Sequence, residues 1–301
     1  MLRIREVTDL KSAELLWRGL SYNQTIFDEW DWRFCFYKYN KLPLCFLAAY
    51  EDEELVGLMP LERHPKHGLE FFAEDPSEES RPFVKSGHEN IIPNLYGAIV
   101  GPAKPYDITG DDEFTKKLEL EDYKYVLPLE GLNNFTDFLN SRLSAKRRNS
   151  LSKEIEAVAK NNFEIEIISP DKNKDKSIET LDSLFSFNVN NFGAESYLLE
   201  AEQAPWKDLL KLDFDWRLIA LNITGQTQAV SFSIKHKGIW HYLITGANFK
   251  DYPGLGKYLV KVNIETAINE GANFFDAGLG DCGWKNLWHF DKIPQYLFKQ
   301  E

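Results

Sequence analysis

The sequence predicts an α+β protein with two domains, each built on a mixed, mainly antiparallel sheet flanked by helices. Residues 44–61 and 216–234 share one pattern, in which an apolar run, a polar turn and a second apolar run follow each other. This pattern is typical of a β-hairpin. Segments with helical periodicity precede both hairpins. The 301 residues are enough for two domains of about 100–200 residues each.

The first half of the chain is expected to begin with helices and to continue with strands. We expect helices over residues 8–20 and 28–39, a hairpin over 43–61 and a third strand at 69–72. The charged stretch 111–122 is expected to be solvated. We therefore place the domain boundary near residue 125, which gives domains at residues 1–125 and 126–301.

The second half repeats this order with an additional basic segment. The expected strands are residues 125–129, 163–168, 216–222 and 229–234, and the expected helices are residues 134–140, 143–158, 178–192 and 198–212. The segment 143–153 is the most basic of the chain.

Residues 239–288 predict a strand, a glycine-rich loop, a helix, a short strand and a second glycine loop. Residues 239–245 are apolar and aromatic, which is typical of a buried strand. The loop that follows reads YPGLG, where the proline removes a backbone donor and the glycines allow positive φ angles. A helical pattern begins at Lys257, Gly271 stands where a helix C-terminal cap is expected, and residues 274–277 read as a buried strand.

A glycine loop before a helix is a typical anion site, because unpaired amides and the helix dipole favour a phosphate there. The loop matches neither G-x-G-x-x-G nor G-x-x-x-x-G-K-[ST], so a dinucleotide fold and a P-loop lose their main support. A tight strand-to-helix turn without a ligand is the alternative. The first domain has no such loop after its third strand, so we expect only the second domain to bind the ligand.

Composition limits the classes of partner. The formal net charge is −12, which disfavours extended nucleic-acid binding. Cys35, Cys45 and Cys282 are scattered and none has zinc-ligand spacing, so we expect no metal site and a reduced compartment. We identify neither an N-terminal apolar leader nor an apolar run of membrane-spanning length, and we therefore expect a cytoplasmic protein.

Three segments of the chain resemble a known family of acyltransferases. They read VLPLEGLNNFTDFLNSRLSAKRRNSLSKEIE, ELVGLMPLERH and DAGLGDCGWKNLWHF, the second of them lying in the first domain. The chain resembles the tandem-GNAT branch that includes the BioF2-like acetyltransferase domains and the FemA, FemB and FemX peptidyltransferases. Trp284 stands where the terminal motif of that family usually has Tyr. The resemblance implies two tandem GNAT-like domains, of which the first is degenerate.

The resemblance also implies acyl transfer from a thioester donor to an amine. The diphosphate of the donor would lie on the loop and helix start, at Pro253, Gly254, Leu255, Gly256, Lys257 and Tyr258. Its pantetheine arm would lie beside the strand that carries Thr245, Gly246 and Ala247, whose amides can also hold the developing oxyanion.

The same resemblance implies roles for residues near the C-terminal end. Lys285, Asp276 and Asp281 are the candidate catalytic residues, with His241 as a further candidate base. Trp284 and Trp288 would form walls of the acceptor pocket, and Arg147 of the basic cluster would bind a phosphate. The alternatives are structural: a turn cap for Asp281, a local hydrogen bond for Asp276, a surface lysine for Lys285, a core histidine for His241 and a solvated helix face for the basic cluster.

We therefore expect an N-acyltransferase that moves an acyl group, acetyl in the simplest case, from acetyl-CoA or another acyl-CoA to a primary amine. The acceptor would be a small molecule such as an amino sugar or an amino acid derivative. A FemX-like transferase that uses aminoacyl-tRNA and a cell-wall precursor is one alternative. A binding module without catalytic activity is the other.

Overall fold

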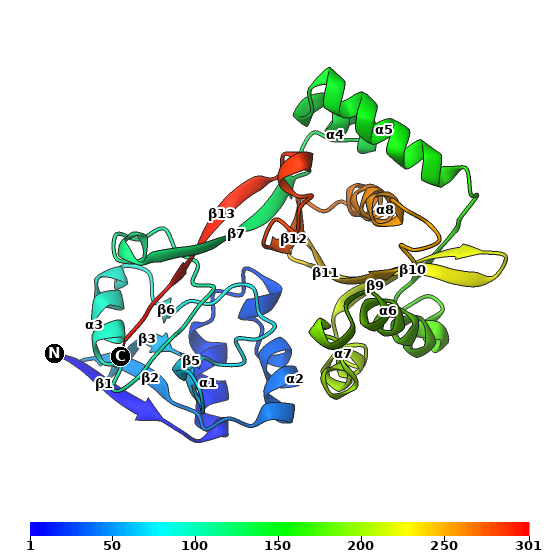
Figure 1. Cartoon of the computed structure of the whole chain (residues 1–301). Coiled ribbons are helices and arrows are strands. Elements are labelled where there is room, and N and C mark those ends of the chain that lie inside the picture. The colour runs from blue at the N-terminus through cyan, green and yellow to red at the C-terminus, as the bar shows by residue number, and fades with distance from the viewer. Residues whose placement is uncertain (301) are drawn as a thin grey trace. The chain divides into compact units, whose positions relative to one another are not determined.

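The computed structural model describes residues 1–300 and divides the chain into two compact units (Figure 1). Unit 1 consists of Met1–Lys124 together with the residues from Lys292 onward, and unit 2 is Tyr125–Asp291. Seven short 3-10 helices are described: η1 (Ile26–Asp28), η2 (Glu89–Ile91), η3 (Thr115–Lys117), η4 (Lys174–Lys176), η5 (Gly193–Glu195), η6 (Glu200–Glu202) and η7 (Asn286–Trp288).

Unit 1 contains a four-stranded antiparallel sheet with the order β1-β2-β3-β6. Its strands are β1 (Leu2–Val7), β2 (Phe46–Glu51), β3 (Glu54–Met59) and β6 (Phe83–Val84), and its helices are α1 (Leu10–Leu20), α2 (Trp30–Asn40) and α3 (Ile92–Gly97). The predicted hairpin is confirmed, with Asp52 and Glu53 at positive φ in its turn. Trp30, Trp32 and Phe36 of the second predicted helix are core residues, and Trp30 packs in one cluster with Trp17 and Phe72.

A second hairpin in unit 1 differs from the prediction. Residues 69–72 were expected to add a third strand to the first hairpin, but β5 (Gly68–Phe71) pairs with β4 (Leu61–His64) as a separate two-stranded sheet. The turn between them approaches another segment closely. A Cβ on Gly68, whose φ is +81°, would lie 2.0 Å from the Pro102 carbonyl oxygen, so only glycine fits there.

A sheet with the order β13-β7-β12-β11-β10-β9-β8 lies mainly in unit 2, while its residues 119–124 and 292–297 belong to unit 1. Its strands are β7 (Glu119–Pro128), β8 (Glu164–Ile168), β9 (Asp215–Ile223), β10 (Gln226–His236), β11 (Ile239–Ala247), β12 (Phe274–Leu279) and β13 (Asp291–Leu297). The helices of unit 2 are α4 (Phe135–Arg142), α5 (Ala145–Ala159), α6 (Ser177–Phe192), α7 (Gln203–Leu209) and α8 (Leu255–Asn269). Strands β8 to β11 form an antiparallel meander, and β12 is parallel to β11.

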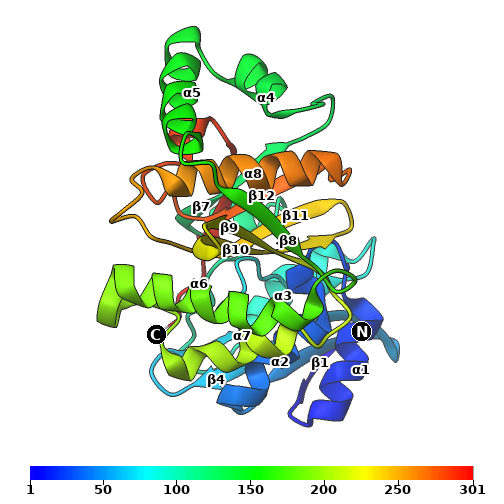
Figure 2. The same ribbon diagram turned by 90° about the vertical axis from the view of Figure 1, so that its right-hand side faces the viewer.

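Helices cover both faces of this sheet (Figure 2). Helix α6 packs on β9, β10 and β11 from one side, whereas α8 packs on β10 and β11 from the other side and is covered in turn by α5. The contact with α6 is close at Gly246, where a Cβ would lie 2.4 Å from the Leu184 carbonyl oxygen. Gly246 therefore faces α6 and not the helix that follows the glycine loop.

One predicted element is shorter than expected, and the charged stretch 111–122 is largely exposed, as predicted, although β7 begins within it at Glu119. The expected long helix over 198–212 is shorter, since α7 spans only Gln203–Leu209 after η6. Residues 292–300 lie in unit 1, where Tyr296 and Gln300 form β-bridges with Ile108 and Ala103.

Candidate functional site

Strands β11 and β12 separate after a short pairing. They are paired at Ile239–Phe274, Trp240–Phe275 and His241–Asp276, and no further pair between them is recorded among residues 1–300. Strand β11 continues to Ala247 in register with β10. The edge of β11 beyond His241 is therefore open on the side of β12.

The register shows which backbone groups face this opening. The Asn248 amide donates to the Gln228 carbonyl oxygen on β10 at 2.8 Å. Backbone groups alternate in direction along an antiparallel strand, so those of Gly246 also face β10. The amides and carbonyls of Thr245 and Ala247 then face the opening.

Side chains of α6 bind the two carbonyls at this edge. Asn188 Nδ2 donates to the Thr245 oxygen at 3.3 Å, and Asn191 Nδ2 donates to the Ala247 oxygen at 2.9 Å. The carbonyls are thereby satisfied by the protein, and the edge presents mainly N–H donors to the opening. Donors in such a row suit carbonyl or oxyanion acceptors.

An irregularity in β11 brings two polar side chains to the same face of the sheet. Tyr242 pairs with Ser233 and Ile244 pairs with Phe232, so the register shifts around Leu243. Such a β-bulge re-aims the side chains on either side of it. As a result, Tyr242 and Thr245 both line the same pocket.

The glycine loop leads into α8 with free backbone donors. Gly254 has a φ of +87° and is the N-cap of α8. The amides of Leu255 and Lys257 donate to the carbonyls of Tyr252 and Gly254. Within residues 1–300, the amides of Gly254 and Gly256 have no recorded acceptor. They are therefore available to an anion at the positive end of the helix dipole.

The opening and the loop border one pocket of about 290 Å³. Its lining residues are Tyr242, Thr245, Phe249, Gly254, Gly256, Lys257, Val260, Trp284 and Trp288. Thr245, both glycines, Lys257 and both tryptophans were predicted site residues. Tyr242, Phe249 and Val260 were missed, because their placement depends on the bulge and on the path of the loop.

Tyr242 and Trp288 bring polar atoms to this largely apolar pocket. Burial raises the pKa of Tyr242 well above its ordinary value, although a hydrogen bond with the Thr245 side chain lowers it in part. The phenol therefore stays protonated at neutral pH. The buried Nε1 of Trp288 has no hydrogen-bond partner in the part of the chain that the structure describes, and an indole N–H is a donor only.

Charged side chains of α5 and α8 meet beside the pocket. Lys257 forms an ion pair with Glu154, which also lies 4.0 Å from Arg147. The hydrogen bond from Lys257 is the main reason why the pKa of Glu154 is lowered. Arg147 Nε also donates to the Leu287 carbonyl at 3.1 Å. Arg147 thus connects α5 to the segment that carries Trp288, and it does not line the pocket.

Lys285 is buried and is bound to the end of β12. Its Nζ donates to the carbonyl oxygens of Gly278 at 3.0 Å and Leu279 at 2.6 Å. It also lies 5.6 Å from the ring centre of Tyr125 and 6.0 Å from that of Trp284. The surface lysine considered as the alternative is therefore excluded, because only 4% of Lys285 is exposed.

Asp276 and His241 form a buried pair away from the pocket. His241 Nδ1 lies 2.8 Å from Asp276 Oδ2, and Asp276 Oδ1 accepts the Gly278 amide at 3.0 Å. His241 and Tyr242 are neighbours in a strand, so their side chains point to opposite faces of the sheet. Since Tyr242 lines the pocket, the pair lies on the opposite face.

Asp281 lies in the second glycine loop and caps a turn. Its Oδ1 accepts the Asn286 amide at 2.6 Å, and its carbonyl accepts the amides of Trp284 and Lys285. These bonds fix the loop that presents the two tryptophans. Asp281 itself is not a lining residue of the pocket.

Three further predicted site residues belong to the glycine loop and the first turn of α8 but do not line the pocket. Leu255 is fully buried, and the Tyr258 ring packs at 6.0 Å from that of Phe163. Pro253 precedes the N-cap and has no N–H to donate.

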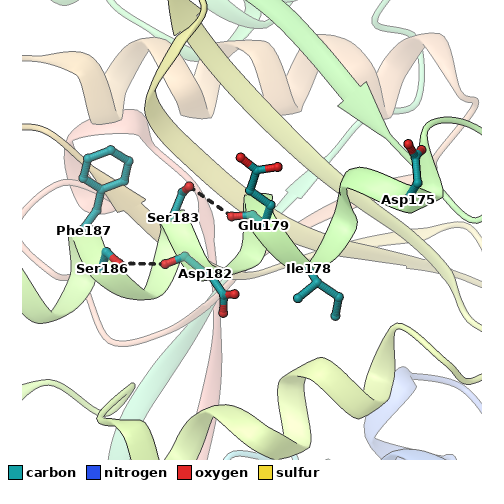
Figure 3. Close-up of a pocket in the computed structure, with 7 residues that line it drawn as sticks. All are labelled: Asp175, Ile178, Glu179, Asp182, Ser183, Ser186 and Phe187. Carbon is teal, nitrogen blue, oxygen red and sulfur yellow. Dashed lines mark hydrogen bonds between the residues drawn. The ribbon is translucent and has the colours of Figure 1, made fainter.

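A larger hollow of about 600 Å³ lies along α6 (Figure 3). Its labelled residues come from α6 and the short segment before it. Ser183 and Ser186 donate to the carbonyls of Glu179 and Asp182, four positions earlier in the same helix. These bonds are internal to the helix, and the hollow is lined only by α6 and the segment before it, whereas the smaller pocket is lined by β11, the glycine loop, α8 and the segment with the two tryptophans.

None of the helices within residues 1–300 combines the length and the apolar character that crossing a bilayer requires.

Comparison with known proteins agrees with this geometry. Residues 145–286, from the start of α5 to η7, match the model of the family described as acetyltransferase (GNAT) domain. No curated protein matches the chain in sequence. The fold therefore comprises two GNAT-like domains, and the matched segment indicates a transferase enzyme.

Solved structures show the same fold over almost the whole chain. The C-terminal domain of a putative lysylphosphatidylglycerol synthetase from Agrobacterium fabrum has a TM-score of 0.63 at 11% identity, covering 97% of this chain and 92% of that one. FemX has a TM-score of 0.58 at 11% identity, covering 99% and 97%. A tandem GNAT protein from the clavulanic acid biosynthesis pathway has a TM-score of 0.57 at 8% identity, covering 99% and 98%.

Proposed function

We propose that the enzyme transfers an acyl group from an acyl-CoA, with acetyl-CoA the simplest donor, to the primary amine of a small acceptor such as an amino sugar or amino acid derivative. The observation that carries this proposal is that two sets of unpaired backbone donors border one pocket. One set is Gly254 and Gly256 at the start of α8, and the other is the open edge of β11.

The residues present suit such a donor. The two glycine amides and the helix dipole favour a diphosphate, and Lys257 adds a positive charge beside them. The amides of Thr245 and Ala247 can pair with the amide carbonyls of a pantetheine arm, as an added strand would. The pocket of about 290 Å³ is close to the lower limit of ligand pockets, roughly 300 Å³, which suits the acyl thioester end.

The reaction needs an attack, a bond cleavage and two proton movements. The amine nitrogen bonds to the thioester carbonyl carbon, the carbon–sulfur bond breaks, the amine loses a proton and the sulfur gains one. The β11 amides stabilise the oxyanion that forms during the attack. Tyr242, which remains protonated, donates a proton to the leaving sulfur.

The placement of the other candidates favours positioning roles. Lys285 binds two carbonyls at the end of β12, and Asp281 caps the turn that follows. Both thereby fix Trp284 and Trp288 at the pocket. Asp276, with His241, stabilises the strand end from the opposite face. The amine loses its proton to the solvent.

Calorimetric titration with acetyl-CoA and with longer acyl-CoAs tests the donor. We expect binding at one site per chain and, with an amine acceptor, release of free thiol. If no acyl-CoA binds, the proposal is wrong.

A second candidate is transfer from aminoacyl-tRNA to a cell-wall precursor, as the resemblance to FemX implies. It is favoured by the exposed Lys146 beside Arg147 and Arg148 at the start of α5, where a nucleic-acid backbone could bind. Transfer of a labelled amino acid from charged tRNA, with no CoA binding, would support this candidate over the first. Both donors are cytoplasmic, and we propose that compartment for the enzyme.

A further inference from the structure

Unit 1 contains a second pocket, of about 310 Å³, that the transferase reaction does not use. It lies between the C-terminal end of α2 and the β4–β5 hairpin. Its polar lining includes Asn40, Glu62, His64, His67, Glu70 and Glu74. All of these residues belong to unit 1.

Two buried carboxylates face each other in this hairpin. Glu62 on β4 pairs directly with Glu70 on β5, and the two residues are only 4% and 7% exposed. Like charges directly opposite in an antiparallel pair are destabilising, and burial of an unpaired charge is more so. A cation between them would remove both effects.

Glu62 has an oxygen that the protein leaves unsatisfied. Its Oε1 accepts the Ala73 amide at 3.0 Å. Its buried Oε2 has no hydrogen-bond partner among the described residues. The nearby Arg33 does not pair with it. The Arg33 guanidinium is used instead by the carbonyls of Phe27, Phe72, Ala73 and Glu79 and by the Ser80 hydroxyl.

Two histidines complete the arrangement at the turn of the hairpin. One ligand atom each of His64, His67 and Glu70 lies within 4.8 Å of the others, and His67 Nδ1 is 3.5 Å from Glu70 Oε2. His64 Nδ1 accepts the amides of Lys66 and His67 at 3.2 and 3.3 Å, so it carries the lone pair that a metal ion would bind in place of these two long hydrogen bonds.

The dipole of helix α2 also favours a cation in this pocket. The helix ends at Asn40, which lines the pocket. The C-terminal end of a helix carries partial negative charge. Helix, carboxylates and imidazoles therefore all favour a positive ligand at one place.

We propose that His64, His67 and Glu70 bind a divalent transition-metal ion of the zinc type, with Glu62 as the fourth ligand. Two imidazoles and carboxylate oxygens form a ligand set that zinc accepts in tetrahedral geometry. The two carboxylates balance the charge of the ion. The bound ion would link β4 to β5, because the ligands come from both strands and from the turn between them.

Titration of tag-free, chelator-treated protein with Zn²⁺ tests the proposal. We expect one ion per chain, and a rise in the thermal midpoint of unit 1 on binding. His67→Ala and Glu70→Gln should each weaken binding by about ten-fold or more. His88→Ala is the matched control, since His88 is also a histidine of unit 1 beside a glutamate, at 3.2 Å from Glu51, and should leave binding unchanged.

Co²⁺ provides a second readout that does not depend on stability. The wild-type protein should give the intense visible absorption of a four-coordinate ion, and Glu62→Gln should change that spectrum, because one ligand is altered. The proposal is overturned if the wild-type chain binds neither ion. It is equally overturned if His67→Ala and Glu62→Gln bind as the wild type does, or if an organic ammonium ion binds in the pocket and metals do not. Acetyl-CoA affinity is expected to be the same in all variants, so this test is separate from that of the proposed function.

Discussion

At the scale of single residues, Gly256 is the position where one added carbon has the clearest consequence. A Cβ there would lie 3.1 Å from the Phe249 ring, and both residues line the pocket. Gly256 is the second residue of α8 and has no positive φ, so Ala in its place favours the helix by up to about 1 kcal/mol. We predict that Gly256→Ala keeps or raises the thermal midpoint but weakens acetyl-CoA binding by about ten-fold, measured by calorimetry.

Gly19→Ala is the control for this substitution, because a Cβ added to Gly19 on α1 would meet no atom within 4 Å. Its acetyl-CoA affinity should equal that of the wild type. Equal affinity in Gly256→Ala would contradict the assignment of the loop.

Tyr242 is the residue whose chemistry we expect to limit turnover. Removal of its hydroxyl takes away the proposed proton donor but leaves the ring, so Tyr242→Phe should lower kcat by about 10²-fold with little change in the KM for acetyl-CoA. With an acyl donor whose thiol is more acidic, Tyr242→Phe should lower kcat by a smaller factor, because that thiolate can leave without a proton. Tyr258→Phe is the control. Equal losses for both thiols would argue against the role of Tyr242.

Asp107 offers a test of charge burial in unit 1. Burial is the main cause that raises its pKa from 3.8 to about 8, followed by the charge of Glu121. The folded state therefore holds a proton that the unfolded chain has lost, and stability decreases as pH rises from about 4 to about 8. Asp107→Asn removes this dependence, and Asn tolerates the φ of 53°.

We predict that Asp107→Asn gains at least ~1 kcal/mol over the wild type between pH 5 and pH 8.5, measured by urea unfolding with a chelator present. Asp111 is exposed, so Asp111→Asn should not gain stability over the wild type as the pH rises. A constant difference between Asp107→Asn and the wild type at both pH values would contradict the prediction.

The catalytic candidates show where residue-level reasoning from the sequence ends. The sequence predicts Asp276 at the end of a strand and Asp281 in the next loop; the position of Asp281 is correct, whereas Asp276 lies inside β12, which continues to Leu279. It cannot show which face Asp276 points to, because this depends on the register of β11 with β12. Thr245, Gly254 and Trp288 line the pocket, and the family resemblance was enough to select them. The position of Tyr242 at the pocket depends on the β-bulge in β11, which no local sequence pattern reveals.

At the scale of elements, the same distinction holds for unit 2. The meander, α8 and its glycine loop follow from apolar periodicity and turn residues, and they are confirmed. The separation of β11 from β12 could not be predicted, because it is a relation between two strands that are far apart in the chain. The final strand β13 was also missed, since Asp291 and Lys292 give it a polar beginning.

The ion pair between α5 and α8 permits a prediction about this pair of helices. Glu154 holds Lys257, and lies near Arg147, beside the proposed diphosphate site. Glu154→Gln removes the competing carboxylate, so both cations become more available to an anion. We predict a few-fold tighter binding of acetyl-CoA, greatest at low salt because the gain is electrostatic. Stability should change by less than about 1 kcal/mol, since the pair is partly exposed.

Glu156→Gln on the same helix is the matched control, because Glu156 is exposed and does not line the pocket. It should leave the affinity and its salt dependence unchanged. Weaker binding in Glu154→Gln would indicate that the carboxylate orders the site and does not compete with the ligand.

At the scale of the whole molecule, the two units are not two successive halves of the sequence. We propose that they are the two domains of the chain, with the last residues returning to the first. Residues 296–300 run beside 103–108, where Tyr296 and Ile108 exchange backbone hydrogen bonds at 3.0 Å, and Gln300 and Ala103 do so at 2.9 Å. The aromatic rings of Phe298 and Tyr96 also pack at 5.0 Å.

This return predicts a selective effect of truncation. A chain that ends at Gln295 loses these hydrogen bonds and the packing of two aromatic side chains, so unit 1 should be less stable by roughly 2–4 kcal/mol. Hydrogen exchange should become faster at the amides of Ala103 and Ile108, whose acceptors are removed. The amides of β10 in unit 2 should keep their protection, and acetyl-CoA should still bind. If β10 lost protection together with Ile108, the two units would unfold as one, and the assignment of the last residues to unit 1 alone would be wrong.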